Sequence, residues 1–219
     1  KMKTAHSDIK NIIFDLGGVI IDIDTQAIVN QMNKMGFTNI EKLHDPEFLA
    51  ILERFEKGII KASTFRNEVK NFLKISVTDT VFDEIWNSML FDIPQRRIDL
   101  VKQLKQNYHV FLLSNSNEIH YDLYVRDLQL RYGYREFDSL FDKAFFSFAL
   151  HLSKPDLDIF RYVLDSESLK PEETLFIDDL EENRAAARRL GIHTIDVATG
   201  SRIVDLFENG LLKANTKID

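Results

Sequence analysis

Five short apolar runs, rich in β-branched and aromatic residues, recur along the 219-residue chain. They cover residues 11–15, 109–114, 143–148, 174–178 and 193–197. Each run is almost continuously hydrophobic, which is typical of strands that are covered on both faces of a parallel sheet. Between the later runs, apolar residues recur at helical spacing over residues 95–106, 156–164 and 181–190. Strands that alternate with helices indicate βαβ units, so the pattern predicts an α/β fold with a Rossmann-like parallel sheet.

The segment between the first two runs has a different pattern. Residues 25–91 contain no strand signal, and their apolar positions predict four amphipathic helices. The expected helix starts carry polar capping residues: Asp24, Asp45 with Pro46 behind it, Ser63 or Thr64, and Thr78 or Asp79. We therefore predict a core made of residues 1–24 and 92–219, with residues 25–91 inserted as a helical cap over the carboxyl edge of the sheet.

Composition narrows the classes of function. Hydrophobic residues make up 44% of the chain and charged residues 29%, which is ordinary for a soluble globular protein. The net charge of −7 and the lack of a Lys/Arg block argue against nucleic acid as a partner. The chain has no cysteine, which excludes disulfides, thiolate zinc sites and cysteine nucleophiles. No apolar run approaches the roughly 18 residues of a membrane span, and the first run is too short for a signal peptide, so we expect a cytoplasmic protein.

Polar residues stand where four of the predicted strands end. They are Asp15 with Gly17 and Gly18 behind it, Ser114 with Asn115, Lys154, and Asp178 with Asp179. Ligands of open α/β sheets bind beyond the carboxyl ends of the strands, so we expect these side chains to converge. Taken singly, each could be a turn residue, a helix cap or a solvated lysine. Their shared place at one edge of the sheet instead indicates a functional site.

The chemistry of such a site is constrained by its charges. Clustered carboxylates repel one another, and their hard oxygen atoms together with phosphate are the ligands that Mg²⁺ prefers. Lys154 adds positive charge, while Ser114 and backbone N–H groups can hold the oxygens of an anion. A carboxylate can act as a nucleophile and form an aspartyl-phosphate. Phosphoryl transfer depends mostly on positioning and charge neutralisation, which this set of residues provides.

The segments "FDLGGVI", "LLSNS", "SKPD" and "FIDDLEEN", in this order, resemble the four motifs of the haloacid dehalogenase-like hydrolase superfamily. The resemblance covers residues 12–197, and the helical insert resembles the family's type 1 cap. The resemblance implies that Asp15 is the nucleophile and a metal ligand, and that Gly17 binds the metal through its carbonyl. Ser114 with Asn115 would bind phosphate, and Lys154 would hold the phosphate and the nucleophile together. Asp179 would bind the metal directly, and Asp178 would be either a metal ligand or an acid that contacts a ligand. Asn183 stands where the family often has another Asp.

One position departs from the family pattern. Family phosphatases usually carry a second Asp two residues after the nucleophile, which protonates the leaving oxygen, and here that position is Gly17. Positioned acid–base catalysis is typically worth about 10²- to 10⁴-fold in rate. By location alone, the possible substitutes are Asp22, Asp24, His44, Glu53 and Glu56. A hinge, a helix cap or a solvated helix face explains each of them more simply, and a positive φ would explain the glycine itself.

The segments "FDLGGVIIDID" and "ERFEKGII" resemble a "DLG" subgroup of the family, which includes α-glucose-1-phosphate phosphatases. An anomeric leaving group is less basic than an ordinary alcohol and tolerates a missing acid better. We therefore predict a Mg²⁺-dependent hydrolase of a small phosphorylated metabolite, such as a sugar 1-phosphate, that works through an aspartyl-phosphate on Asp15. The alternatives are a non-catalytic protein that binds a phosphate ligand and a metal-independent 2-haloacid dehalogenase, which would leave Asp178 and Asp179 unexplained.

Overall fold

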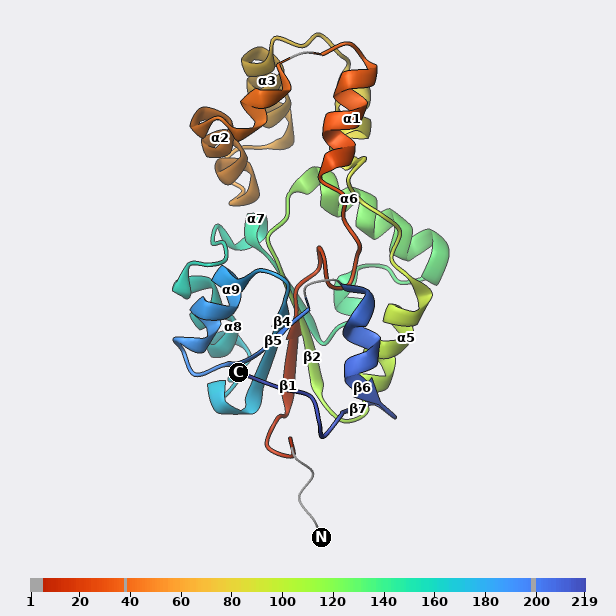
Figure 1. Ribbon diagram of the computed structural model, residues 1–219, viewed down its shortest axis with the longest axis vertical. Helices are drawn as coiled ribbons and strands as arrows, with labels where there is room; N and C mark the ends of the chain where they lie inside the picture. The colour runs from red at the N-terminus through yellow and green to blue at the C-terminus, as the bar shows by residue number, and fades with distance from the viewer. Residues whose placement is uncertain (1–5, 38, 198–199) are drawn as a thin grey trace.

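A five-stranded parallel sheet forms the centre of the computed structural model, which describes residues 6–37, 39–197 and 200–219 (Figure 1). Its strands are β1 (Asn11–Phe14), β2 (His109–Ser114), β3 (Lys143–Phe146), β4 (Thr174–Asp178) and β5 (His193–Asp196). They lie in the order β3-β2-β1-β4-β5, and Phe14 at the end of β1 is in register with Leu112 and Ile177. The predicted α/β fold is confirmed. Strand β3 is shorter than predicted, because Ser147 and Phe148 begin a short helix, α7 (Ser147–Leu150).

Helices cover both faces of this sheet. Helices α5 (Gln95–Leu104) and α6 (Glu118–Asp127) lie on one side, and α8 (Leu157–Ser166) and α9 (Glu181–Arg188) lie on the other (Figure 1). Successive side chains of a strand point to opposite faces, so Phe14 of β1 joins the hydrophobic cluster around α5, whereas Ile13 joins the cluster that contains α8 and α9 residues. This double burial explains the continuous apolar runs.

Helix α6 was missed by the sequence analysis. Its buried residues are Ile119, His120 and Tyr124, so a histidine interrupts the apolar stripe that would have indicated a helix. The other elements of the core are short: the π-helix η2 (Leu128–Tyr132), the 3-10 helices η3 (Phe137–Ser139), η4 (Pro171–Glu173) and η5 (Gly200–Leu206), and the antiparallel strands β6 (Phe207–Glu208) and β7 (Leu211–Leu212).

The segment between β1 and α5 is helical, as its pattern indicates. It contains α1 (Gln26–Lys34), the 3-10 helix η1 (Ile40–His44), α2 (Pro46–Glu56), α3 (Ala62–Leu73) and α4 (Asp79–Asn87), which share a separate hydrophobic cluster. Two of the expected caps are present, because Asp45 accepts the N–H of Glu47 at 2.9 Å and Thr78 accepts the N–H of Val81 at 3.3 Å.

The predicted start of α3 at Ser63 or Thr64 is wrong. The helix begins at Ala62, whose N–H donates to the carboxylate of Glu118 at 3.1 Å. Glu118 belongs to α6 of the core. A distant carboxylate therefore takes the place of a local cap, and local sequence carries no signal for it.

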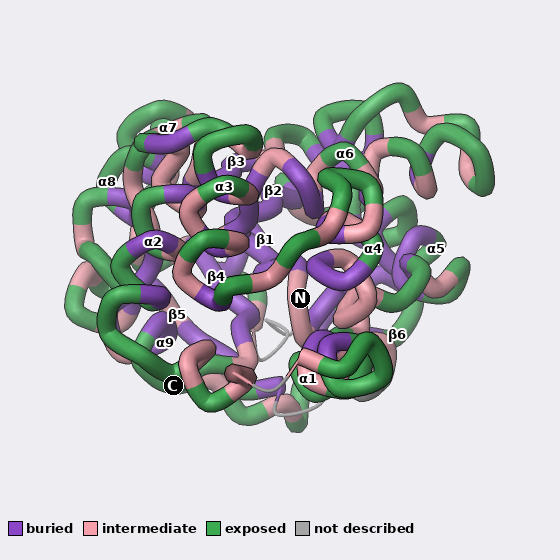
Figure 2. The backbone as a smooth tube through the Cα atoms, turned by 90° about the horizontal axis from the view of Figure 1, so that it is seen from above, coloured by how far each residue is buried: buried purple, intermediate pink, exposed green. Residues whose placement is uncertain are grey.

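These helices stand over the carboxyl ends of the strands (Figure 1). Seen from above, they ring the buried ends of β1, β2 and β4 (Figure 2). The two chain segments that connect these helices to the core run side by side. The N–H of Asp24 donates to the main-chain carbonyl of Met89 at 2.8 Å, and the N–H of Phe91 donates to the main-chain carbonyl of Asp22 at 3.1 Å. The boundaries of the cap at residues 25 and 91 stay a prediction, and these paired connections lie next to them. Across the described ranges, no helix has the length and apolar character needed to cross a membrane.

Candidate active site

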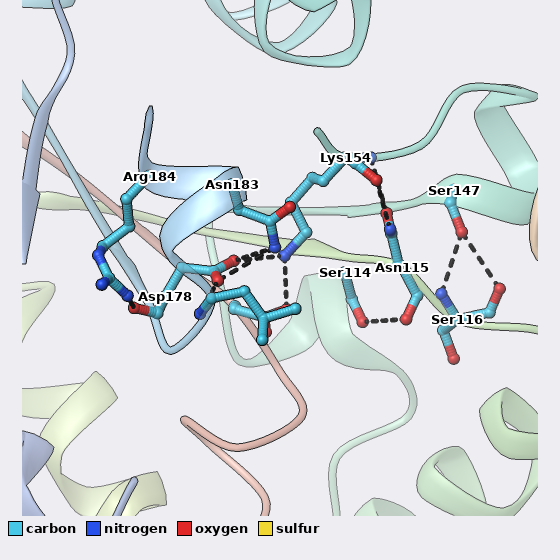
Figure 3. A network of polar contacts seen from close by, with 10 residues as sticks. Ser114, Asn115, Ser116, Ser147, Lys154, Asp178, Asn183 and Arg184 are labelled. Carbon is cyan, nitrogen blue, oxygen red and sulfur yellow. Dashed lines mark hydrogen bonds and ion pairs between the residues drawn. The ribbon is translucent and has the colours of Figure 1, made fainter. Parts of the chain in front are cut away.

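Lys154 stands at the centre of the polar residues that the sequence analysis singled out (Figure 3). Its Nζ donates to Oδ1 of Asp15 at 2.7 Å and to Oδ2 of Asp178 at 2.8 Å, and its side chain is 1% exposed. The ends of β1 and β4 supply the two carboxylates, and the loop after α7 supplies the ammonium. The fold thus brings residues from three distant parts of the chain into one buried ion network.

Asn115 fixes the loop that carries this lysine. Its side-chain amide donates to the carbonyl of Lys154 at 2.8 Å and accepts the N–H of Lys154 at 2.9 Å. The neighbouring Ser114 is buried at the end of β2, and its hydroxyl donates to the Asn115 carbonyl at 3.3 Å. Ser114 lines the same cavity as Asp15 and Lys154. The part of Ser114 and Asn115 in phosphate binding stays a prediction, but the second task of Asn115, as a brace for Lys154, comes from the structure alone.

The two neighbouring acids at the end of β4 differ in their surroundings. Asp178 is fully buried, and both of its carboxylate oxygens accept the side-chain amide of Asn183 at 3.1 Å. The N–H of Leu180 also donates to Asp178 Oδ1, at 2.8 Å. Asp179 is partly exposed and lines the cavity. Its carboxylate is therefore the freer of the two to meet a ligand.

Arg184 is a part of this network that the sequence analysis missed. It is buried on α9, and its Nη1 donates to the main-chain carbonyl of Asp178 at 2.8 Å (Figure 3). The sequence does hold one signal for the burial of Arg184. The residue follows Asn183 directly and lies three positions before Ala187, and both of these neighbours are on the buried face of α9. An arginine on a buried helix face needs a partner, and here the partner is the end of a strand.

The charges at this point do not balance. One oxygen from each of Asp15, Asp178 and Asp179 lies within 4.8 Å of the others, and Lys154 is the ammonium that pairs with two of them. Burial raises the pKa of Asp15 to about 7, with Lys154 lowering it and Asp178 raising it. Burial and then Asp178 also raise the pKa of Asp179. Burial lowers the pKa of Lys154, but the two carboxylates outweigh that effect and raise it, so the lysine stays charged.

The donor atoms present suit Mg²⁺. Carboxylates in excess over the ammonium leave a net negative charge that a divalent cation neutralises, and their hard oxygens match this ion. The main-chain carbonyl of Gly17 adds another oxygen, since Gly17 lines the cavity and none of the hydrogen bonds recorded over the described ranges ends on that carbonyl. Asp15, Asp179 and the Gly17 carbonyl would hold the ion, with Asp178 beside them.

The two glycines after Asp15 have different structural reasons. Gly18 has a φ of +76°, and a Cβ there would lie 2.4 Å from Oδ2 of Asp179. Gly17 does not have a positive φ, and a Cβ there would meet only Ile23, at 3.7 and 3.8 Å, which is ordinary contact. The conformational explanation for Gly17 is therefore wrong, because Gly18 is the residue that the backbone and the close carboxylate require to be glycine.

A cavity of about 570 Å³ opens between this cluster and the helices above it. Its floor is polar, and most of its upper wall is apolar: Ile23, Ile28, Val29, Leu43, Phe48, Leu49, Leu52, Trp86, Met89 and Leu90. His120 reaches the same space with a ring that stacks on Trp86 at 5.6 Å. Burial lowers the pKa of His120 to about 3, so this ring is neutral at ordinary pH.

Three of the five possible substitutes for the missing acid have other partners. Asp22 pairs with the buried Arg97 at 2.7 Å, Asp24 accepts the N–H of Gln26 at 3.0 Å, and Glu53 pairs with Lys57 at 2.8 Å. None of these three lines the cavity, whereas His44 and Glu56 do.

Comparison with known proteins identifies the family. The family profile described as haloacid dehalogenase-like hydrolase matches residues 9–191. The chain belongs to this family. The predicted family is thereby confirmed.

Named and solved relatives agree with this assignment. The chain is 29% identical over 197 residues to a D-ribitol-5-phosphate phosphatase of Bacteroides thetaiotaomicron. The aligned region covers 88% of this chain and 94% of that protein. It is 27% identical over 190 residues to a sesquiterpene phosphatase of Aspergillus oryzae, covering 84% of this chain and 87% of that protein. A solved HAD family enzyme of Bacteroides thetaiotaomicron, in complex with magnesium, superposes with a TM-score of 0.83 at 36% identity, over 92% of this chain and 99% of that one. The predicted enzyme class, a HAD-like phosphatase, is confirmed.

Proposed function

We propose that this phosphatase uses Mg²⁺ and hydrolyses a small phosphate monoester through an aspartyl-phosphate on Asp15. The observation that carries the proposal is the buried contact of Lys154 with Asp15 and Asp178, at 2.7 and 2.8 Å, on the floor of a cavity that Asp179 also lines. The same HAD family enzyme of Bacteroides thetaiotaomicron was also solved in complex with magnesium and inorganic phosphate, with a TM-score of 0.80 and 36% identity, which supports a site that takes both groups.

The residues divide the work of the reaction. A carboxylate oxygen of Asp15 bonds to phosphorus as the bond between phosphorus and the leaving oxygen breaks. Lys154 stays charged beside Asp15 and holds that carboxylate in place, and Ser114 donates to a phosphoryl oxygen. Water then bonds to phosphorus, and Asp15 is released. Bound Mg²⁺ supplies the positive charge that neutralises the phosphoryl oxygens.

The proposed substrate is a small phosphorylated metabolite. The sugar 1-phosphate suggested by the "DLG" subgroup remains a proposal, and the named relative from Bacteroides adds D-ribitol 5-phosphate to the test panel. The apolar upper wall of the cavity and the Aspergillus relative add phosphates of apolar alcohols. The excess of carboxylates over ammonium in the cluster weighs against the metal-independent dehalogenase.

A phosphatase screen tests this proposal. Purified protein is incubated with the panel in Mg²⁺ and, in parallel, in excess chelator, and release of inorganic phosphate is measured. Turnover in Mg²⁺ that chelator stops is the expected result. Binding of phosphate esters without turnover of any panel member would favour the non-catalytic alternative, and full activity in chelator would contradict the metal.

The nucleophile is tested by Asp15→Asn. We expect the rate to fall by at least about a thousandfold, because the amide is not a nucleophile. The matched control is Asp165→Asn, which makes the same exchange at an exposed position of α8 and should keep the wild-type rate. A substantial residual rate in Asp15→Asn, measured before any deamidation, would show that another group attacks phosphorus.

A further inference from the structure

Glu56 places a carboxyl group in the cavity that the proposed chemistry leaves without a task. It is the last residue of α2, it is partly buried, and it lines the same cavity as Asp15 and Lys154. Across the ranges that the structure describes, its carboxyl group makes no hydrogen bond and no ion pair. The acid one turn earlier, Glu53, is exposed and already pairs with Lys57. A partly buried carboxyl group with no protein partner is available to a ligand.

The core holds this end of α2 in place. The hydroxyl of Ser147 donates to the carbonyl of Glu56 at 2.6 Å, and Nδ1 of His151 contacts the carbonyl of Lys57 at 2.8 Å. Lys57 also reaches Asp156 at 3.4 Å. Gly58, with a φ of +64°, lies so close to Phe148 that a Cβ would be 2.0 Å from its carbonyl oxygen.

These contacts all fall on residues 147–156, the segment that contains Lys154. Glu56 belongs to the helical insert, but its main chain is docked beside the loop that positions the catalytic lysine. Its carboxyl group is therefore held at the cavity by the same core segment that completes the ion network, as a positioned acid requires.

Its protonation suits an acid at neutral pH. Burial, and then the charge of Glu53, raise the pKa of Glu56 to about 7. A general acid works best with a pKa near the working pH. The ionisable groups around it are Glu53 and Lys57 on its own stretch of chain, and His44, His120, Asp15, Lys154 and Asp179 along the cavity.

We propose that Glu56 protonates the leaving-group oxygen and so replaces the carboxylate that Gly17 lacks. The proposal rests on the proposed function. In the first step the bond from Asp15 to phosphorus forms, the ester P–O bond breaks, and the proton of Glu56 passes to the departing oxygen. In the second step a water oxygen bonds to phosphorus, the bond to Asp15 breaks, and the water proton returns to Glu56. Atoms and charge balance without a further reagent.

The test compares Glu56→Gln with the wild type in Mg²⁺ on two probes. One is 2,4-dinitrophenyl phosphate, whose leaving group needs no proton, and the other is the best alkyl phosphate from the screen. We expect the variant to lose at least about a hundredfold in alkyl turnover. With the aryl probe it should release a burst of dinitrophenol close to the enzyme concentration and then turn over slowly, because water lacks a base. The matched control is Glu47→Gln, an exposed position on the same helix, which should keep both rates.

The burst also shows that the variant is folded. Alkyl turnover within a few-fold of the wild type would overturn the proposal. So would an equal loss of alkyl turnover and of the aryl burst, which indicates a structural role, or a rise in KM with kcat unchanged, which indicates binding only. A wild type that hydrolyses neither probe would instead contradict the proposed function.

If Glu56→Gln does not fold, the pH profile of the wild type decides. The ratio of alkyl to aryl turnover should fall as pH rises through about 7, where Glu56 loses its proton, because only the alkyl leaving group needs that proton. A parallel decline for both probes would overturn the proposal.

Discussion

At Gly17 the chain lacks a carboxylate that its family usually carries, although the backbone accepts a side chain there. A Cβ would make only ordinary contact with Ile23. We therefore expect Gly17→Asp, introduced into the Glu56→Gln variant, to raise alkyl phosphate turnover about tenfold or more. This is a fraction of the roughly 10²- to 10⁴-fold that a well-positioned acid contributes to the rate. The comparison of alkyl and aryl phosphates on the single and double variants checks this.

The matched control for that experiment is Gly18→Ala. A positive φ and the nearby Asp179 carboxylate should make this variant less stable by about 1 kcal/mol or more. A double variant that stays as slow as Glu56→Gln would mean that position 17 does not point an acid at the leaving oxygen.

Glu56 should also lower stability at alkaline pH. Its folded-state pKa of about 7 lies above its ordinary value of 4.5, so the unfolded state releases its proton first as pH rises. Stability is unaffected below about pH 4.5 and falls as pH rises through about 7. We expect Glu56→Gln to be more stable than the wild type at pH 8, by on the order of 1–3 kcal/mol, since the residue is only partly buried.

Urea unfolding of both proteins at pH 4 and pH 8 measures this difference. Glu47→Gln, at an exposed site, should match the wild type at both values. An advantage of Glu56→Gln that is equal at the two pH values would show that burial of its charge is not the cause.

At the scale of elements, polar contacts tie the helical insert to the core at the ends of its helices, and opening of the insert would have to break them. Glu118 binds the start of α3, and Ser147 binds the end of α2. We expect the insert to close on substrate, because closure excludes water and brings Glu56 over Asp15. Ser147→Ala should favour the open state, since it removes the 2.6 Å hydrogen bond to the Glu56 carbonyl.

Because the chain has no cysteine, two introduced cysteines are its only thiol labelling sites. Met35 at the end of α1 and Tyr162 on α8 are both exposed and suit a fluorophore pair. Single-molecule energy transfer should show one narrow distance distribution with Mg²⁺ and inorganic phosphate, and a broader one without them. Identical distributions in both conditions would argue that the insert does not move.

For the whole molecule, the excess negative charge of the site should make the free energy of unfolding depend on Mg²⁺ binding. Three carboxylates around one ammonium repel in a chain that already carries a net charge of −7. We expect Mg²⁺ at about 100 times its Kd to stabilise the protein by about 2.7 kcal/mol, because it binds the folded state. Thermal unfolding in Mg²⁺ and in chelator at equal ionic strength measures the shift.

Asp179→Asn should lose most of that shift, because Asp179 offers the freer carboxylate, and Asp165→Asn should keep it. Equal melting temperatures in Mg²⁺ and in chelator would contradict a magnesium site formed by these acids.

Local sequence pattern determined much of this architecture. The apolar runs marked all five strands of the main sheet, because burial on both faces leaves no polar alternation. The edge rule for parallel sheets then placed Asp15, Ser114, Lys154 and Asp178 in one cluster before any contact was known. The helical insert was equally visible, since its period of apolar residues and its caps at Asp45 and Thr78 are local features.

Only the tertiary structure decided which of several similar residues meet at the cavity and which partners they contact. Asn115 braces Lys154 across 39 positions of the chain, and Glu118 begins α3 from 56 positions away, so neither contact leaves a mark on neighbouring residues. The sequence offered five acids and bases for the missing proton donor, and the fold leaves Glu56 partly buried at the cavity. It likewise offered two adjacent glycines, and only the backbone angle at Gly18 and its distance to Asp179 tell them apart. Periodicity records which face of an element is buried, whereas a particular partner is set by how distant elements pack.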